Sequence, residues 1–209
     1  NLDALSVEAY TRAAELRPGD PSHYFQIGTI YMTEGNLLLQ FAASNPKSAA
    51  KARESAAPLY AKSEKAFKKA IEISSNYGMA IYNLGSVYDR QGKINDAIKQ
   101  LEKLAPFNSN QPGLMFELGL LYYRGDRKDD AVSQLQRAIL LTPDYANARW
   151  YLGLIYEERN DIPAAIEQME KILSVNINKG NRTVTDKLRQ LRSGIKTSSP
   201  VKAIDQTPL

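Results

Sequence analysis

The feature that most constrains this chain is a repeat with a period of 34 residues. Three stretches align without gaps when they start at Gly78, Pro112 and Ala146. The identical columns are Leu84, Leu118 and Leu152; Gly85, Gly119 and Gly153; Tyr88, Tyr122 and Tyr156; and Ala97, Ala131 and Ala165. A fixed period of this length predicts a linear stack of similar units, because each unit has an apolar face that only a neighbour can cover.

Each unit carries the pattern of two short helices. Apolar residues recur at intervals of three and four in both halves of the repeat, which is the spacing of one face of an α-helix. The shared glycine and alanine fall where the two helices approach closely, since larger side chains would push the helices apart. Pro143 stands at the end of its unit, where a helix has to stop. The pattern therefore predicts an all-α fold of antiparallel helix pairs.

The repeat resembles the tetratricopeptide repeat family. That family's frame has Leu at position 7, Gly at 8, Tyr at 11, Ala at 20 and 27, an apolar residue at 24 and often Pro at 32. The resemblance implies a right-handed superhelical stack of helix pairs (A and B) with a C-terminal capping helix. The chain departs from the frame at position 4, often Trp in the family, and at position 27. Position 4 holds Tyr24, Ile81, Met115 and Arg149, and position 27 of the three aligned units holds Leu104, Ala138 and Ile172.

The same frame divides the whole chain into segments. We expect helix B of a truncated preceding repeat at residues 1–20, a repeat with an insertion at 21–77, regular repeats at 78–111, 112–145 and 146–179, a capping helix at 180–195 and a disordered tail at 196–209. Gly28 and Gly85 lie 23 residues further apart than one period, so the insertion covers roughly residues 36–57. Its halves are expected to lengthen both helices, with a turn at residues 44–46. Because the first helix pair lacks its helix A, the chain is expected to be cut from a longer protein.

Composition argues against several kinds of active site. The chain has no cysteine, which excludes disulfides, thiol nucleophiles and cysteine-based zinc sites. Its single histidine, His23, cannot build a histidine-rich metal site. The acidic clusters fall at the turns between helices A and B, where charge favours solvent and helix N-termini. We therefore expect no catalytic residue, no metal and no cofactor in this chain, and leave open whether a longer parent protein is an enzyme.

The expected binding surface is the inner face of the stack. In the tetratricopeptide family, helix A lines this concave groove, mainly at frame positions 2, 5, 9 and 12. Position 5 is aromatic in every unit, as Phe25, Tyr82, Phe116 and Trp150. The other residues expected there are Met32, Met79, Asn83, Ser86, Asp89, Leu120, Tyr123, Asn147, Leu154 and Glu157. A row of rings would suit an extended peptide, a helix or stacked sugar rings, and the alternative is that the rings pack on neighbouring repeats.

Two further features bear on ligands. Some relatives bind a C-terminal carboxylate with lysine and arginine at positions 2, 5 and 6 of helix A, and the absence of these cations disfavours that binding mode here.

The insertion offers a second candidate surface, made of Leu37, Leu38, Leu39, Phe41, Lys47, Lys51 and Arg53. Its apolar residues either pack against Leu59 and Tyr60 inside a lengthened hairpin, or protrude and serve self-association, a partner or a membrane surface.

These features leave competing functions. The first is a non-catalytic scaffold that holds a segment of a partner protein in the groove. The second rests on the run "LEKLAPFNSNQPGLMFELGLLYY", which resembles repeat tails of bacterial O-antigen-ligase-like and polysaccharide-polymerase proteins. That resemblance implies an extracytoplasmic accessory domain in envelope glycan assembly, with the groove contacting glycan or assembly partners. Nucleic acid is disfavoured, because the basic segments at residues 47–69 and 179–209 flank a mildly acidic body. The sequence does not choose between cytoplasmic and extracytoplasmic locations, or fix the oligomeric state.

Overall fold

The computed structural model describes residues 2–194, and every regular element in this range is helical. The α-helices are α1 (Leu2–Leu16), α2 (Pro21–Ser44), α3 (Ala49–Ile73), α4 (Gly78–Arg90), α5 (Ile94–Leu104), α6 (Pro112–Arg124), α7 (Lys128–Leu141), α8 (Ala146–Glu158), α9 (Ile162–Ser174) and α10 (Arg182–Ser193), and the 3-10 turns are η1 (Pro46–Ser48) and η2 (Asn176–Asn178). The predicted all-α class is confirmed. The tail expected at 196–209 lies outside the described residues.

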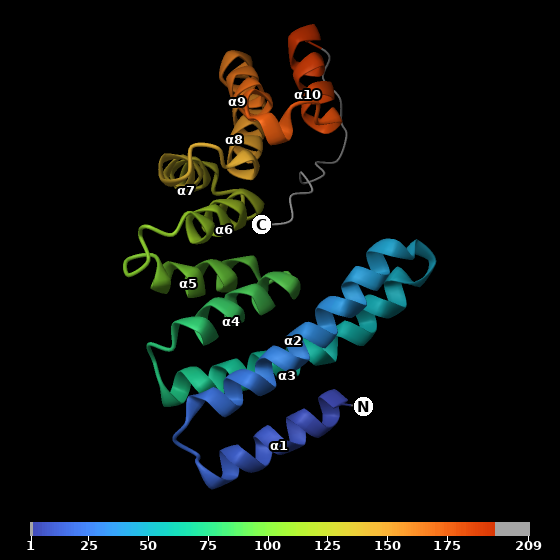
Figure 1. Cartoon of the computed structure of the whole chain (residues 1–209), viewed down its shortest axis with the longest axis vertical. Coiled ribbons are helices and arrows are strands. Elements are labelled where there is room, and N and C mark those ends of the chain that lie inside the picture. Colours follow the sequence, from blue (N-terminus) through green and yellow to red (C-terminus); the bar gives the residue numbers. More distant parts are fainter. Residues whose placement is uncertain (1, 195–209) are drawn as a thin grey trace. The chain divides into compact units, whose positions relative to one another are not determined.

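The helices fall into two compact units that divide between Pro106 and Phe107. The first unit contains α1 to α5 and the second contains α6 to α10 (Figure 1). Within each unit the helices pair as hairpins, namely α2 with α3 and α4 with α5 in the first, and α6 with α7 and α8 with α9 in the second. Among the described residues, no helix is both long and apolar enough to cross a lipid bilayer.

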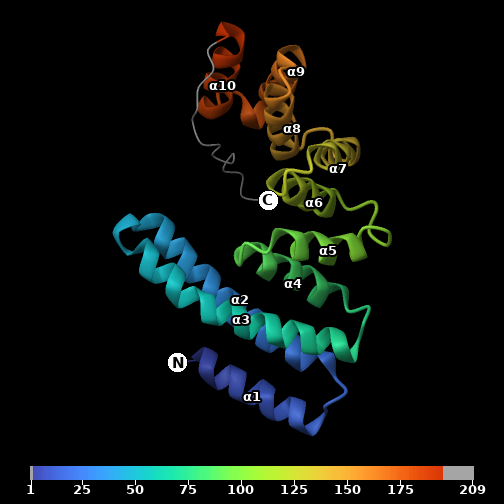
Figure 2. The ribbon, with the colours of Figure 1, turned by 180° about the vertical axis from the view of Figure 1, so that it is seen from behind.

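The α2–α3 hairpin is longer than the others, and its far end projects beyond α1 and α4 in both views (Figures 1 and 2). Small buried residues let the two helices lie close along this extension, namely Ala42, Ala52 and Ala56. Gly35 makes room for the buried ring of Tyr60, because a Cβ there would lie 2.9 Å from the ring. The Tyr60 hydroxyl donates to Asn36 Oδ1 at 2.8 Å. The inserted residues therefore continue both helices of this repeat.

The turns between helices A and B repeat one backbone conformation. Gly92, Asp126 and Asn160 occupy the same frame position, and all three have a positive φ, of 74°, 58° and 62°. Glycine adopts this left-handed conformation without strain, and Asp and Asn are the side chains that tolerate it best. Equivalent turns thus orient helix B in the same way after α4, α6 and α8.

Candidate functional site

The inner-face positions of the first unit lie on α2 and α4. The intervals between frame positions 2, 5, 9 and 12 place them on one face of each helix. Met79 is the most open of them, with 58% of its surface exposed. The other predicted residues of this unit are half-buried, namely Phe25, Met32, Tyr82, Asn83, Ser86 and Asp89. The structure therefore gives the first unit a partly exposed face of mixed polar and apolar character.

Phe25 is partly a core residue. Its ring centroid lies 5.8 Å from that of Phe67 on α3 and 5.4 Å from that of Tyr77, which immediately precedes α4. Phe67 is fully buried against Gly28, where an added Cβ would lie 2.6 Å from the ring. One side of the Phe25 ring is thus held by its own hairpin, and its half-exposed remainder is what a ligand can reach.

The inner face of the second unit is organised by four rings, which we call the aromatic cluster: Phe116, Tyr123, Tyr145 and Tyr151. Phe116 on α6 lies 5.1 Å from Tyr145 and 6.0 Å from Tyr151, measured between ring centroids. Tyr123, two turns along α6, lies 5.8 Å from Tyr151 on α8. Tilted ring pairs at these distances add attraction beyond the area they bury. The cluster fixes the orientation of Phe116 and Tyr123, which remain half-buried.

Polar contacts complete this face. The Tyr123 hydroxyl donates to Glu158 Oε1 at 2.6 Å, and Lys128 pairs with Glu158 at 3.0 Å. Partial burial, together with the neighbouring Glu158 carboxylate, raises the pKa of Tyr123 above its usual range, so this phenol stays protonated and acts as a donor. Glu157 pairs with Lys187 of α10 at 2.5 Å. The carboxylates at this end of α8 are therefore neutralised by lysines of the same unit.

Trp150 is buried, so of the two alternatives left open by the sequence it does not follow the one with an exposed ring. Only 4% of its surface is exposed, and Leu154, one turn along α8, is also buried. The predicted role as a ring offered to a ligand requires an open face, and this structure does not provide one. The Trp150 indole Nε1 and Asn147 Oδ1 are buried with no hydrogen-bond partner among residues 2–194. The expected row of four exposed rings is thus reduced to half-buried Phe25, Tyr82 and Phe116.

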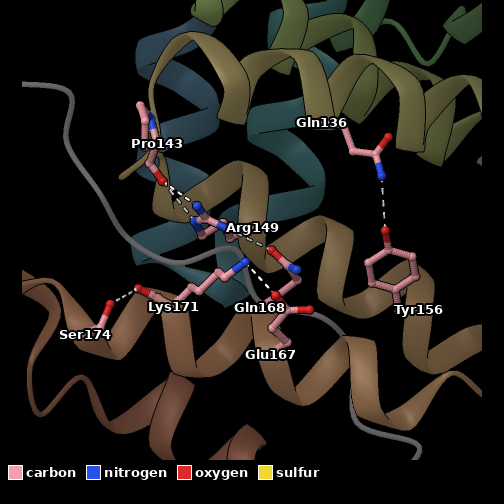
Figure 3. Close-up of polar contacts among 8 residues, drawn as sticks. All are labelled: Gln136, Pro143, Arg149, Tyr156, Glu167, Gln168, Lys171 and Ser174. Carbon is pink, nitrogen blue, oxygen red and sulfur yellow. Dashed lines mark hydrogen bonds and ion pairs between the residues drawn. The ribbon is translucent and has the colours of Figure 1, made fainter.

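Arg149, which departs from the family frame at position 4, has a structural role (Figure 3). Its guanidinium donates twice to the carbonyl of Pro143, at 3.0 and 2.7 Å, and once to the buried Oε1 of Gln168, at 3.0 Å. Burial lowers the pKa of Arg149. These bonds join the turn before α8 to α9. Figure 3 also shows Lys171 pairing with Glu167 at 2.5 Å on α9.

The residues of the second predicted surface differ in their exposure. Leu37 and Phe41 are 59% and 52% exposed, whereas Leu38 and Leu39 are half-buried. The cations predicted to accompany them, Lys47, Lys51 and Arg53, are exposed. The alanines between α2 and α3 leave no space for Leu37 and Phe41 inside the hairpin, so these two side chains protrude from the extension.

Two cluster residues, Tyr145 and Tyr151, were missed by reading the frame at positions 2, 5, 9 and 12. Tyr151 stands at frame position 6, which the carboxylate-binding relatives use, and Tyr145 ends the preceding unit. Tyr77 ends its own unit in the same way and packs on Phe25 as Tyr145 packs on Phe116. The recurring tyrosine before helix A was the signal that could have found this contact.

Comparison with known proteins agrees with the geometry. A tetratricopeptide repeat model matches residues 116–178, and a second tetratricopeptide repeat model matches residues 80–105. These two segments therefore carry tetratricopeptide repeats. No curated protein matches it by sequence.

Solved structures with a similar fold include MamA, which is 19% identical with a TM-score of 0.66, over 85% of this chain and 88% of that chain. YrrB, described as a TPR protein with an unusual peptide-binding site, is 21% identical with a TM-score of 0.57, over 88% of this chain and 99% of that chain. The first TPR of Spaghetti (RPAP3), bound to the HSP90 peptide SRMEEVD, is 22% identical with a TM-score of 0.52, over 58% of this chain and 95% of that chain. At these identities the likeness establishes the fold alone.

Proposed function

We propose that this chain is a non-catalytic interaction scaffold that binds a segment of a partner protein along the inner face of its second unit. The observation that carries the proposal is the arrangement of α6. Phe116, Leu120 and Tyr123 stand at frame positions 5, 9 and 12, so they share one face of the helix, and all three are half-buried. They form a short apolar strip that remains accessible after the unit has packed.

The strip has the physical properties of a binding anchor. Two of its members are held in place by rings of the aromatic cluster, so binding freezes few additional rotamers. Glu157 and Glu158 at its edge are paired with lysines, so a partner need not supply charge there. An apolar or aromatic side chain of a partner segment, inserted beside Leu120, would bury area on both rings. One protein of similar fold is described as having a peptide-binding site and another was solved with a bound peptide, which supports the same kind of ligand.

The test compares two leucine-to-serine variants. Leu120→Ser removes the apolar centre of the strip, and Leu140→Ser makes the same change on α7 at a side chain that is 80% exposed. Tagged wild type and both variants are used to capture partners from the source cells, and each recovered partner segment is then measured as a synthetic peptide by calorimetry. We expect Leu120→Ser to weaken binding about tenfold, which corresponds to about 1.4 kcal/mol, and Leu140→Ser to leave it unchanged. Equal binding by wild type and Leu120→Ser would place the partner elsewhere.

A further inference from the structure

The first unit contains a cavity that the inner-face function does not use. Its volume is about 800 Å³, within the range of pockets that hold small ligands or peptide side chains, and it lies between α1, α2 and α3. Tyr24, Ile27 and Tyr31 of α2 form its floor, at frame positions 4, 7 and 11 rather than at the inner-face positions. The cavity therefore opens on a different surface from the groove expected for this fold.

Small residues keep the cavity open. Ala14 on α1 and Ala66 on α3 both line it and are both buried, so the two helices pack on α2 without filling the space between them. The floor residues Tyr24, Ile27 and Tyr31 are all half-buried, so part of each side chain is accessible. An apolar or aromatic side chain of a ligand would pack against these three residues.

The rim of the cavity is cationic. Four lysines of α3 line it, namely Lys62, Lys65, Lys68 and Lys69, against the two glutamates Glu15 and Glu72. Lys68 pairs with Glu64 at 2.5 Å, and Lys69 pairs with Glu72 at 2.9 Å.

The remaining two lysines are available to a ligand. Lys62 lies 5.1 Å from the centre of the Tyr31 ring, and neither Lys62 nor Lys65 forms an ion pair within the described part of the chain. Both lysines are exposed beside the cavity floor, so an anionic ligand can reach them from solvent.

We propose that this cavity binds an acidic segment of a partner protein, with an apolar or aromatic side chain of the segment on the tyrosine floor and flanking carboxylates on Lys62 and Lys65. The length of the rim fits a short segment. Lys62 and Lys65 are three residues apart on α3, a rise of about 4.5 Å at 1.5 Å per residue. Carboxylates one or two residues apart in an extended segment, at about 3.3 Å per residue, can therefore reach both. Nucleic acid fits less well, because Glu15 and Glu72 interrupt the rim and no arginine among residues 2–194 lines it.

The test uses a defined probe, the capped and fluorescently labelled peptide Asp-Glu-Phe-Glu-Asp, titrated by anisotropy with the intact chain. Lys62→Glu with Lys65→Glu reverses the free charges of the rim. The matched control, Lys99→Glu with Lys103→Glu, makes the same change in net charge at exposed lysines of α5 outside the cavity. We expect saturable one-to-one binding that weakens about tenfold in the rim variant and less than about twofold in the control.

Four further measurements separate the alternatives. Replacing the phenylalanine of the probe by alanine is expected to weaken binding, because the tyrosine floor loses its contact. Leu120→Ser is expected to bind the probe as wild type does. The cavity proposal and the groove proposal can therefore be refuted separately. The proposal is overturned if both charge-reversal variants lose binding equally, if free phenylacetate binds as tightly as the peptide, or if a single-stranded oligonucleotide displaces the peptide at lower concentration. Absence of binding to wild type overturns it as well.

Discussion

Replacing Gly119 by alanine tests the close approach of helices A and B in the α6–α7 hairpin. A Cβ added at Gly119 would lie 2.8 Å from Leu135 Cγ, 2.9 Å from its Cδ2 and 3.3 Å from its backbone nitrogen. Leu135 is fully buried, and its Cγ atom cannot move away without a change of rotamer inside a packed core. Relief therefore requires α7 to shift relative to α6.

The size of the effect follows from two opposing contributions. Overpacking of a buried site costs about 1–3 kcal/mol. Alanine has a higher helix propensity than glycine, by about 0.8–1 kcal/mol, and this gain offsets part of the loss. The expected result for Gly119→Ala is a decrease of about 1–2 kcal/mol in the free energy of unfolding.

Gly153→Ala is the matched control at the same frame position. Its added Cβ would overlap only Met169 Cε, the end of a flexible unbranched side chain, and the next atoms lie at ordinary contact distances of 3.4 and 3.5 Å. Because the methionine can swing aside while the propensity gain remains, we expect a change between a loss of about 0.5 and a gain of about 1 kcal/mol.

Urea unfolding followed by far-ultraviolet circular dichroism measures both changes, and hydrogen exchange locates them, since stacked repeats can open one unit at a time. A loss for Gly153→Ala as large as that for Gly119→Ala would refute the reasoning. It would mean that the identity of the clashing atom does not decide the cost.

Three further changes probe the side chains described above. Trp150→Ala should lower the free energy of unfolding by about 3–5 kcal/mol, as for a buried aromatic residue, and an unchanged urea midpoint would show that the ring is not part of the core. Arg149→Met should cost about 1–3 kcal/mol in the same assay, because Gln168 and the Pro143 carbonyl lose their donor, and an equally stable variant would contradict that role. Desolvation raises the pKa of Glu64, but hydrogen bonds from Lys68, Lys93 and Gln91 outweigh it and lower this pKa from 4.5 to about 2. Because the pKa is lower in the folded state, the stabilisation is present above pH 4.5 and is lost as the pH falls from 4.5 towards 2, so wild type should lose stability more steeply than Glu64→Gln in acid unfolding titrations over this window.

The helix pairs could be predicted because they depend on local, periodic information. The glycine column places the close helix contacts, and the excess spacing between Gly28 and Gly85 is enough to predict the lengthened hairpin. Both signals can be read from the sequence without knowing which distant residues are in contact. The repeat pattern was therefore enough to indicate the all-α fold class.

The exposure of a side chain could not be predicted in the same way, because it depends on which residues of other helices cover that side chain. Position 5 is aromatic in every unit, yet Trp150 is buried while Phe116 stays half-open. The rings that pack on Phe116, namely Tyr145 and Tyr151, likewise lie outside the frame positions used for the groove. The cavity between α1, α2 and α3 was missed for the same reason, since its lining comes from three different helices.

The two proposed surfaces should respond differently to salt, and this follows from how each treats its charges. On the inner face of the second unit, Glu157 and Glu158 are paired with Lys187 and Lys128, so binding there gains chiefly from burying apolar area. At the cavity of the first unit, a ligand must be attracted by lysines that form no ion pair within the described part of the chain, and added salt screens that attraction. Affinity that falls steeply with ionic strength at the cavity, and weakly at the inner face, is therefore the physical signature that separates the two surfaces within one protein.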